Sequence, residues 1–355
     1  MARSFIEELR SFTDNEYHIV LSEGLARQID QKAFGEQFTF YSIPYRPATK
    51  ARTPWYNDKF LKQIELNVKP QVVFTTSGPA YFRSQAPHLM GFNLPHYIYP
   101  ESPYFNLLSW RSRMLLWLKG KAIRHFYRRD ADAIVGQTED VTKRASQWLG
   151  IAKAFTVTNT ISAFYTDAKV EEVTLPSRGE GEFRLLCFSR YYQHKNFEII
   201  NGIADLVDLV DGVRFVTTLP EDVFEEVFTL KAKEIVHNIG PVPVHLGPSL
   251  YKQCDALFAP SLLECFSANY VEAMATGTPV IAADLTFASS ICRGAGVYFK
   301  PLSARDALNK IRQLRDDEKL RAQLIENGNS ELMKFYSAKE RAKKFLQIST
   351  GLLGA

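Results

Sequence analysis

Two glutamates in the second half of the chain form the clearest arrangement for chemistry. Glu264 and Glu272 are eight residues apart, with the first in an expected loop and the second in the helix that follows. Ionised carboxylates accept hydrogen bonds from sugar hydroxyls, often in pairs, so this spacing suits recognition of a ribose or hexose better than acid/base catalysis. The spacing alone leaves an alternative open, in which Glu264 is a solvated loop residue and Glu272 a surface helix residue.

A second cluster could supply positive charge. Arg190 and Lys195 are five residues apart, across an expected strand-to-helix turn. A rigid guanidinium and a mobile ammonium can together hold a diphosphate without a metal ion. The backbone N–H groups of Phe266, Ser267 and Ala268, at the start of the next helix, would favour the same anion. An arginine and a lysine in a polar turn are common, so the pair by itself is a weak signal.

The segment that must position the glutamates is predicted to be one βαβ unit. We expect a strand over Asp255–Ser261, a loop over Leu262–Ser267 and a helix over Ala268–Thr276, which Gly277 and Pro279 end. The loop then lies at the carboxyl end of a parallel sheet, where open α/β sheets bind ligands.

Strands alternate with helices through the rest of the chain, which predicts parallel sheets covered on both faces. In the first half, strands are expected at Gln71–Thr76, Pro95–Tyr99 and Asp132–Val135, and helices at Leu107–Tyr127 and Glu139–Leu149. In the second half, strands are expected at Phe183–Phe188, Val213–Thr217, Ala256–Ala259 and Pro279–Ala283. The simplest architecture is two Rossmann-like domains in tandem, facing each other across a cleft.

The polar segment Val170–Glu182 contains one proline and two glycines and is predicted to be the linker between domains 1–169 and 183–335. Residues 336–355 include a strongly helical stretch, Glu340–Ile348, expected to pack across the domain junction.

The start of the chain is unusual for this architecture. A helix is expected over Arg3–Phe12, followed by a strand over Tyr17–Leu21. A Rossmann unit normally opens with a strand and a glycine-rich turn. We therefore expect the amino-terminal domain to lack its first strand.

Length and composition set the broad class. The chain has 355 residues, with 46% hydrophobic and 23% charged residues, which corresponds to about two globular domains. Its apolar runs are far shorter than the roughly 20 residues of a membrane span, and its first residues do not resemble a signal peptide. Four scattered cysteines, without metal-ligand spacing, are expected to be small buried residues of a cytoplasmic protein.

The charge is distributed unevenly. Residues 1–160 hold 21 Lys and Arg against 14 Asp and Glu, although the net charge of the chain is only +4. Between Arg111 and Arg129 aromatic residues are interleaved with the basic ones, and residues 102–129 contain no acid. This pattern suits an anionic membrane surface, with a solvated helix face as the alternative. No motif supports nucleic-acid binding.

Asp130 and Asp132 resemble a metal-binding Asp-x-Asp pair. They adjoin Arg128 and Arg129 and precede a buried strand, so salt bridges at the strand edge are the favoured interpretation and no metal is expected.

The run from Glu264 to Ile281 resembles the Glu-x7-Glu signature of retaining glycosyltransferases with the two-domain GT-B fold, the group 1 or family 4 class. Three further segments are similar to the same family, and the resemblance covers roughly Val72 to the carboxyl terminus: Phe188–Asn196, Gly296–Asp306 and Asp130–Ile151.

The resemblance implies a role for each candidate residue. Arg190 and Lys195 would bind the diphosphate, Glu272 the ribose hydroxyls and Glu264 the donor sugar, so that Arg190, Lys195 and Glu264 serve catalysis. The backbone of Cys265, Phe266, Ser267 and Ala268 would surround sugar and phosphate, and Gly240 would lie beside the nucleotide base. On the acceptor side the family leads us to expect a histidine, and His96 and Glu101 lie near its place.

The implied reaction moves a sugar from a UDP- or GDP-linked donor to an acceptor hydroxyl with retention at the anomeric carbon, without a cofactor. The acceptor would be a glycan or a lipid-linked molecule, in surface polysaccharide or glycolipid biosynthesis at the inner face of the cell membrane. Two alternatives stay open: a nucleotide-sugar epimerase, and a non-catalytic sugar-nucleotide-binding protein.

Overall fold

The computed structural model describes residues 2–165, 171–207 and 211–353. The chain forms two compact units. The amino-terminal unit contains residues 1–99, 108–160 and 336–355, and the carboxyl-terminal unit contains residues 100–107 and 161–335.

The carboxyl-terminal unit is built on a parallel sheet in the strand order β12-β11-β10-β7-β8-β9. Its strands are β7 (Phe183–Cys187), β8 (Val213–Thr217), β9 (Val236–Asn238), β10 (Ala256–Ala259), β11 (Val280–Ala283) and β12 (Gly296–Phe299). The order is that of a doubly wound Rossmann sheet. From β7 the chain adds β8 and β9 on one side and then β10, β11 and β12 on the other, so the strand order reverses between β7 and β10. The strands expected in this half of the chain are confirmed.

The α-helices of this unit are α7 (Ile199–Ala204), α8 (Glu221–Val227), α9 (Leu230–Lys233), α10 (Gly247–Gln253), α11 (Ala268–Ala275), α12 (Thr286–Cys292), α13 (Ala304–Asp316) and α14 (Glu318–Leu332). Helices α7 to α12 lie between these strands in the chain, and α13 and α14 follow the last one. Every residue of β7, β10 and β11 is buried. Short apolar runs of this kind form central parallel strands because helices cover both faces of the sheet.

The strands of the amino-terminal unit form two parallel sheets. β1 (Tyr17–Ser22) pairs with β2 (Phe38–Ile43). The second sheet has the order β3-β4-β5-β6 and consists of β3 (Val73–Thr75), β4 (His88–Gly91), β5 (Ala133–Gly136) and β6 (Ala154–Thr156). A helix precedes β1 in the chain, as expected.

One strand prediction in this unit is wrong. Residues 95–99 do not form a strand, because Pro95–Tyr97 is a short 3-10 helix, η2. Proline lacks the N–H group that a central strand needs for its ladder. The fully buried strand at this point of the chain is β4, a four-residue apolar run that includes a histidine.

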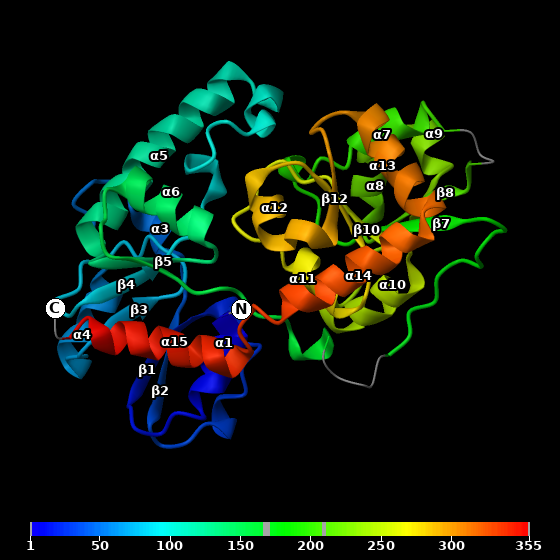
Figure 1. Cartoon of the computed structure of the whole chain (residues 1–355). Coiled ribbons are helices and arrows are strands. Elements are labelled where there is room, and N and C mark those ends of the chain that lie inside the picture. Colours follow the sequence, from blue (N-terminus) through cyan, green and yellow to red (C-terminus); the bar gives the residue numbers. More distant parts are fainter. Residues whose placement is uncertain (1, 166–170, 208–210, 354–355) are drawn as a thin grey trace. The chain divides into compact units, whose positions relative to one another are not determined.

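The helices of the amino-terminal unit include both ends of the described chain. They are α1 (Ala2–Leu9), α2 (Glu23–Ala26), α3 (Pro47–Lys50), α4 (Lys59–Val68), α5 (Trp110–Asp130), α6 (Glu139–Leu149) and α15 (Ala338–Gly351). Figure 1 shows α1 beside α15. The Phe5 ring lies 5.2 Å from Phe345 and 5.4 Å from Phe74, so the two helices share one apolar core.

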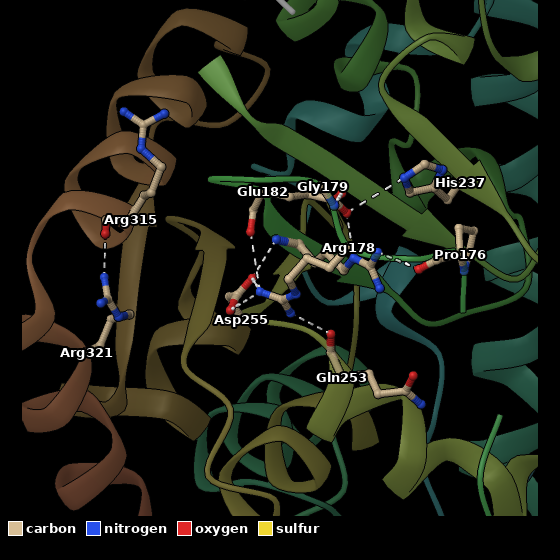
Figure 2. A network of polar contacts seen from close by, with 10 residues as sticks. Pro176, Arg178, Gly179, Glu182, His237, Gln253, Asp255, Arg315 and Arg321 are labelled. Atoms are coloured by element: carbon tan, nitrogen blue, oxygen red, sulfur yellow. Dashed lines mark hydrogen bonds and ion pairs between the residues drawn. The ribbon is translucent and has the colours of Figure 1, made fainter. Parts of the chain in front are cut away.

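The expected linker begins at Val170, outside the described residues, and its remainder belongs to the carboxyl-terminal unit. Charged residues fix it there (Figure 2). Arg178 donates to Asp255 at 2.9 Å, and Asp255 also accepts from the Arg184 N–H at 2.7 Å. The Arg184 guanidinium pairs with Glu182 at 2.5 Å, and both side chains are buried. The polar segment is thus held to the sheet.

The four cysteines are buried thiols, as expected. Throughout residues 2–165, 171–207 and 211–353, no helix combines the length and the apolar character required to cross a membrane.

Candidate functional site

Two loops meet at the point where the strand order of the carboxyl-terminal sheet reverses. One follows β7 and the other follows β10, and a crevice at this position is the usual ligand site of a doubly wound sheet. The Leu262 N–H donates to the His194 carbonyl at 2.7 Å, and the Asn196 side-chain amide donates to the Pro260 carbonyl at 3.3 Å. Asn196 has a φ of 56°, a left-handed conformation that asparagine tolerates well. These bonds fix the two loops to each other.

Lys195 and Glu264 form an ion pair between these loops. Lys195 ends the 3-10 helix η5 (Gln193–Lys195), and Glu264 lies before α11. Each side chain is 14% exposed. Glu264 is therefore not a solvated loop residue, the alternative that its spacing alone leaves open. Low exposure strengthens the attraction between the charges, and it would equally strengthen the attraction of Lys195 for a phosphate oxygen.

Arg190 lies on the same loop as Lys195 and is exposed. Within the described residues, its guanidinium group forms no hydrogen bond or ion pair, whereas its carbonyl accepts from the Ser189 hydroxyl at 3.0 Å. An exposed guanidinium group at this edge of the sheet can donate two parallel hydrogen bonds to a phosphate.

The start of α11 completes this side of the site. Ser267 precedes the helix and is buried, and its side chain does not cap the first N–H groups. Cys265 is also buried, and the ring of Phe266 lies 6.1 Å from that of Phe335. The first N–H groups of a helix have no partner within it, so those of α11, including Ala268, favour an anion in this crevice.

Glu272 lies inside the unit, at 8% exposure, so it is not a surface helix residue. The hydroxyl of Tyr251, on α10, donates to its Oε2 at 3.2 Å. Burial raises the pKa of Glu272, and the hydroxyls of Tyr165 and Tyr251 partly oppose that rise. Burial and the neighbouring Glu272 carboxylate raise the pKa of the Tyr165 phenol, whose ring lies 5.8 Å from that of Tyr251.

Sequence reasoning missed Tyr165 and Tyr251. They lie 107 and 21 residues from Glu272 along the chain, so no local spacing connects them to it. The one available signal is general, since a buried tyrosine hydroxyl usually finds a polar partner.

Two further candidates, Gly240 and Glu101, also belong to the carboxyl-terminal unit. Gly240 follows β9 with a φ of 73°, a left-handed conformation suited to glycine. Glu101 belongs to the segment 100–107, where the Ser102 hydroxyl donates to the Leu262 carbonyl at 2.6 Å. This segment therefore contacts the loop that carries Glu264. The second acceptor-side candidate, His96, belongs to η2 of the amino-terminal unit and is half-buried.

Asp130 and Asp132 have structural partners. Arg129 donates to Asp130 at 2.5 Å and 3.0 Å, and Asp132 accepts from the His88 N–H at 2.8 Å. The Arg129–Asp130 pair is a salt bridge of the predicted kind, whereas Asp132 accepts a hydrogen bond from the backbone. In the part of the chain that the structure describes, no three His, Cys, Asp or Glu side chains are grouped so as to hold a metal ion.

Comparison with known proteins supports the resemblance. Residues 217–331 match the family "Glycosyl transferases group 1". A stretch of 101 residues is 30% identical to the N,N'-diacetylbacillosaminyl-diphospho-undecaprenol alpha-1,3-N-acetylgalactosaminyltransferase of Campylobacter jejuni. That stretch makes up 28% of this chain and 27% of the relative, so the match spans about a quarter of the relative's length.

Solved structures extend the similarity to the whole fold. The crystal structure of a glycosyltransferase from Rickettsia africae is 17% identical with a TM-score of 0.71, over 99% of this chain and 94% of that one. The structure of HepE from Anabaena in complex with UDP is 14% identical with a TM-score of 0.69, over 99% of this chain and 96% of that one. Residues 217–331 are thus similar to the group 1 glycosyl transferases, and the whole chain has the fold of the GT-B glycosyltransferases.

Proposed function

We propose that this protein is a retaining glycosyltransferase that transfers a sugar from a nucleotide diphosphate sugar to an acceptor hydroxyl, without a metal ion. The carboxyl-terminal unit binds the donor, and UDP- or GDP-linked sugars are the candidate donors. The group 1 domain and the UDP complex of HepE support this class of substrate.

The observation that carries the proposal is the pairing of Lys195 with Glu264 at the reversal point of the sheet. Transfer of a sugar builds up negative charge on the departing diphosphate, so fixed positive charge at that point lowers the barrier. Lys195 and Arg190 belong to the segment that follows β7, and α11 begins after the loop that follows β10. Together they supply that charge without a metal.

The two glutamates have separate roles in the proposal. Glu272, which accepts a hydrogen bond from the Tyr251 hydroxyl, binds the ribose hydroxyls of the donor. Glu264 touches the donor sugar once Lys195 turns to the diphosphate. The leaving phosphate itself helps to remove the acceptor proton, so the reaction needs no separate base.

The acceptor is a glycan or a lipid-linked molecule, and the reaction takes place in surface polysaccharide or glycolipid biosynthesis at the inner face of the cell membrane. The Campylobacter relative, whose name includes a diphospho-undecaprenol acceptor, and the basic aromatic helix α5 support a lipid-linked acceptor.

Donor hydrolysis provides the first test. The full chain is incubated with UDP- and GDP-linked sugars, and release of the free nucleoside diphosphate is followed with and without candidate acceptors. We expect slow hydrolysis of one donor that accelerates when an acceptor is added. Interconversion of donor sugars without an acceptor would identify an epimerase, and tight binding without any turnover would identify a binding protein; either result would contradict the proposal.

A further inference from the structure

The first half of α5 presents an apolar stripe to solvent. Trp110, Met114, Trp117 and Leu118 have the spacing of one helical face and are 68%, 47%, 57% and 50% exposed. The buried residues of α5 begin only at Gly120 and lie in its second half. The core of the unit therefore leaves the exposed stripe uncovered.

Cations surround this stripe. None of the exposed Lys and Arg side chains of α5 forms an ion pair with a described residue; they are Arg111, Arg113, Lys119, Lys121, Arg124 and Arg128. The Lys121 ammonium lies 3.8 Å from the centre of the Trp117 ring, and the Arg111 guanidinium lies 5.4 Å from that of Trp110. Aromatic rings and unpaired cations thus share one surface.

The fold adds a second segment to this surface, far away in the sequence. The Pro54 carbonyl lies 2.8 Å from Nε2 of His125 and accepts from Arg129 at 3.0 Å, and the Tyr56 carbonyl accepts from Arg129 at 2.6 Å. These bonds hold residues 54–56 against the second half of α5. Trp55, next to Pro54, is 79% exposed. The cations of residues 46–59 are exposed as well; they are Arg46, Lys50, Arg52 and Lys59.

The one acid of the second segment is not exposed at the surface. Asp58 is 0% exposed and accepts from the hydroxyls of Tyr45 at 3.0 Å and Tyr56 at 2.7 Å. We call α5 residues 110–128 together with residues 46–59 the basic aromatic surface.

We propose that the basic aromatic surface binds the face of a lipid bilayer that contains anionic lipids. The exposed tryptophans and aliphatic side chains enter the interface between headgroups and acyl chains, while the surrounding cations bind the lipid phosphates. This inference deepens the proposed function, because it gives a lipid-linked acceptor a surface on which to reach the enzyme.

Charge complementarity selects the bilayer over two other partners. A second copy of this chain would bring unpaired cations against unpaired cations, which costs free energy. A nucleic acid would satisfy the cations but would leave the aliphatic side chains of Met114 and Leu118 in water. An anionic bilayer satisfies both kinds of side chain.

Co-sedimentation with vesicles tests the proposal on the full chain. We expect binding to phosphatidylcholine vesicles with about a third phosphatidylglycerol to be at least roughly tenfold tighter than to phosphatidylcholine alone, and to weaken as salt is added. The double variant Arg113→Glu/Lys121→Glu should lose about tenfold or more of this affinity. The double variant Arg52→Glu/Trp55→Ser, in the second segment, should lose several-fold.

Matched controls keep these losses interpretable. Lys343→Glu changes an exposed lysine of α15 in the same unit, and Met333→Ser changes a methionine that is 85% exposed. Neither should alter vesicle binding. Circular dichroism and thermal unfolding of each variant should match those of the natural chain.

Tryptophan fluorescence reports insertion directly. A variant that keeps only Trp117 should shift to shorter wavelength with anionic vesicles and be quenched by brominated lipids. A variant that keeps only Trp148, which stacks on Tyr97 with ring centres 5.1 Å apart, should show neither effect.

Equal binding to neutral and anionic vesicles, or an unchanged Trp117 signal, would overturn the inference. So would tighter binding to single-stranded RNA than to anionic vesicles, or self-association that the same variants abolish. Vesicle binding needs no nucleotide sugar, and donor hydrolysis needs no lipid. Failure of one proposal is therefore distinguishable from failure of the other.

Discussion

The ammonium group of Lys195 pairs with the Glu264 carboxylate across 69 residues of sequence, at the carboxyl edge of the β7–β10 pair. A ligand that binds either side chain must therefore displace the other side chain from the pair. Under the proposed function, a diphosphate bound by Lys195 would release the Glu264 carboxylate, which could then accept hydrogen bonds from the neighbouring sugar. In the proposed function, this exchange couples donor binding to the exposure of the Glu264 carboxylate.

Replacement of Lys195 by alanine should reduce kcat by about 10²–10³-fold, because one fixed charge that stabilises the departing diphosphate is lost. The KM for the donor should change less than kcat, since Arg190 and the start of α11 still bind the phosphates. Steady-state kinetics measure both constants. Lys231→Ala is the control, since its exposed ammonium lies 3.7 Å from Asp205, and it should leave them unchanged.

Replacement of Glu272 by alanine should weaken nucleotide binding roughly 10–100-fold, the cost of losing hydrogen bonds to a charged group. Titration calorimetry with the free nucleoside diphosphate measures this loss without any turnover. Unchanged affinity would remove Glu272 from the donor site.

Tyr251→Phe should change the pH dependence of the same binding. Burial raises the pKa of Glu272, and the Tyr251 hydroxyl holds it down. Only the ionised carboxylate is a full acceptor for ribose hydroxyls, so binding is lost as pH falls through the pKa of the folded protein. Without the hydroxyl that pKa rises, and affinity should begin to fall at a higher pH than in the natural chain. Identical pH profiles would show that Tyr251 only fills space.

Turnover should be insensitive to EDTA, because Lys195, Arg190 and the α11 N–H groups supply the positive charge. Donor hydrolysis is measured after exhaustive chelation, with and without added Mg²⁺. Loss of most activity in EDTA, and its recovery with the metal, would contradict this prediction.

The stability of the amino-terminal unit should fall in mild acid. His88 is fully buried in β4, where burial lowers its pKa from 6.5 to about 4. Between these values the unfolded chain binds a proton that the folded chain does not, so stability is lost as pH falls from 6.5 towards 4. The shift corresponds to about 3 kcal/mol at most.

Urea unfolding at several pH values between 7 and 4 measures this effect. His88→Gln should flatten the pH dependence of the unfolding free energy. His245→Gln should not, because the His245 side chain is 47% exposed.

Local sequence was sufficient to predict the βαβ unit around Glu264. Its strand, loop and helix are contiguous, and Gly277 ends α11 in the left-handed conformation expected of a helix stop. The same reasoning failed at residues 95–99, because an apolar aromatic run looks like a strand even where a proline begins a 3-10 helix.

The partners of the site residues could not be predicted, since they come from distant positions. No spacing joins Tyr251 to Glu272, or Pro54 to His125, and only the folded chain places these pairs together. A sequence pattern identifies a residue's chemical type and its element, whereas its contacts depend on tertiary packing.

The packing of α1 against α15 has a consequence for synthesis. The first helix of the chain shares its core with Phe345 and Ile348, near the other end. On the ribosome, residues 161–335 emerge before those partners do, so the carboxyl-terminal unit can fold before the amino-terminal unit is complete. A nascent chain would therefore expose Phe5 and Leu9 until Phe345 has left the ribosome.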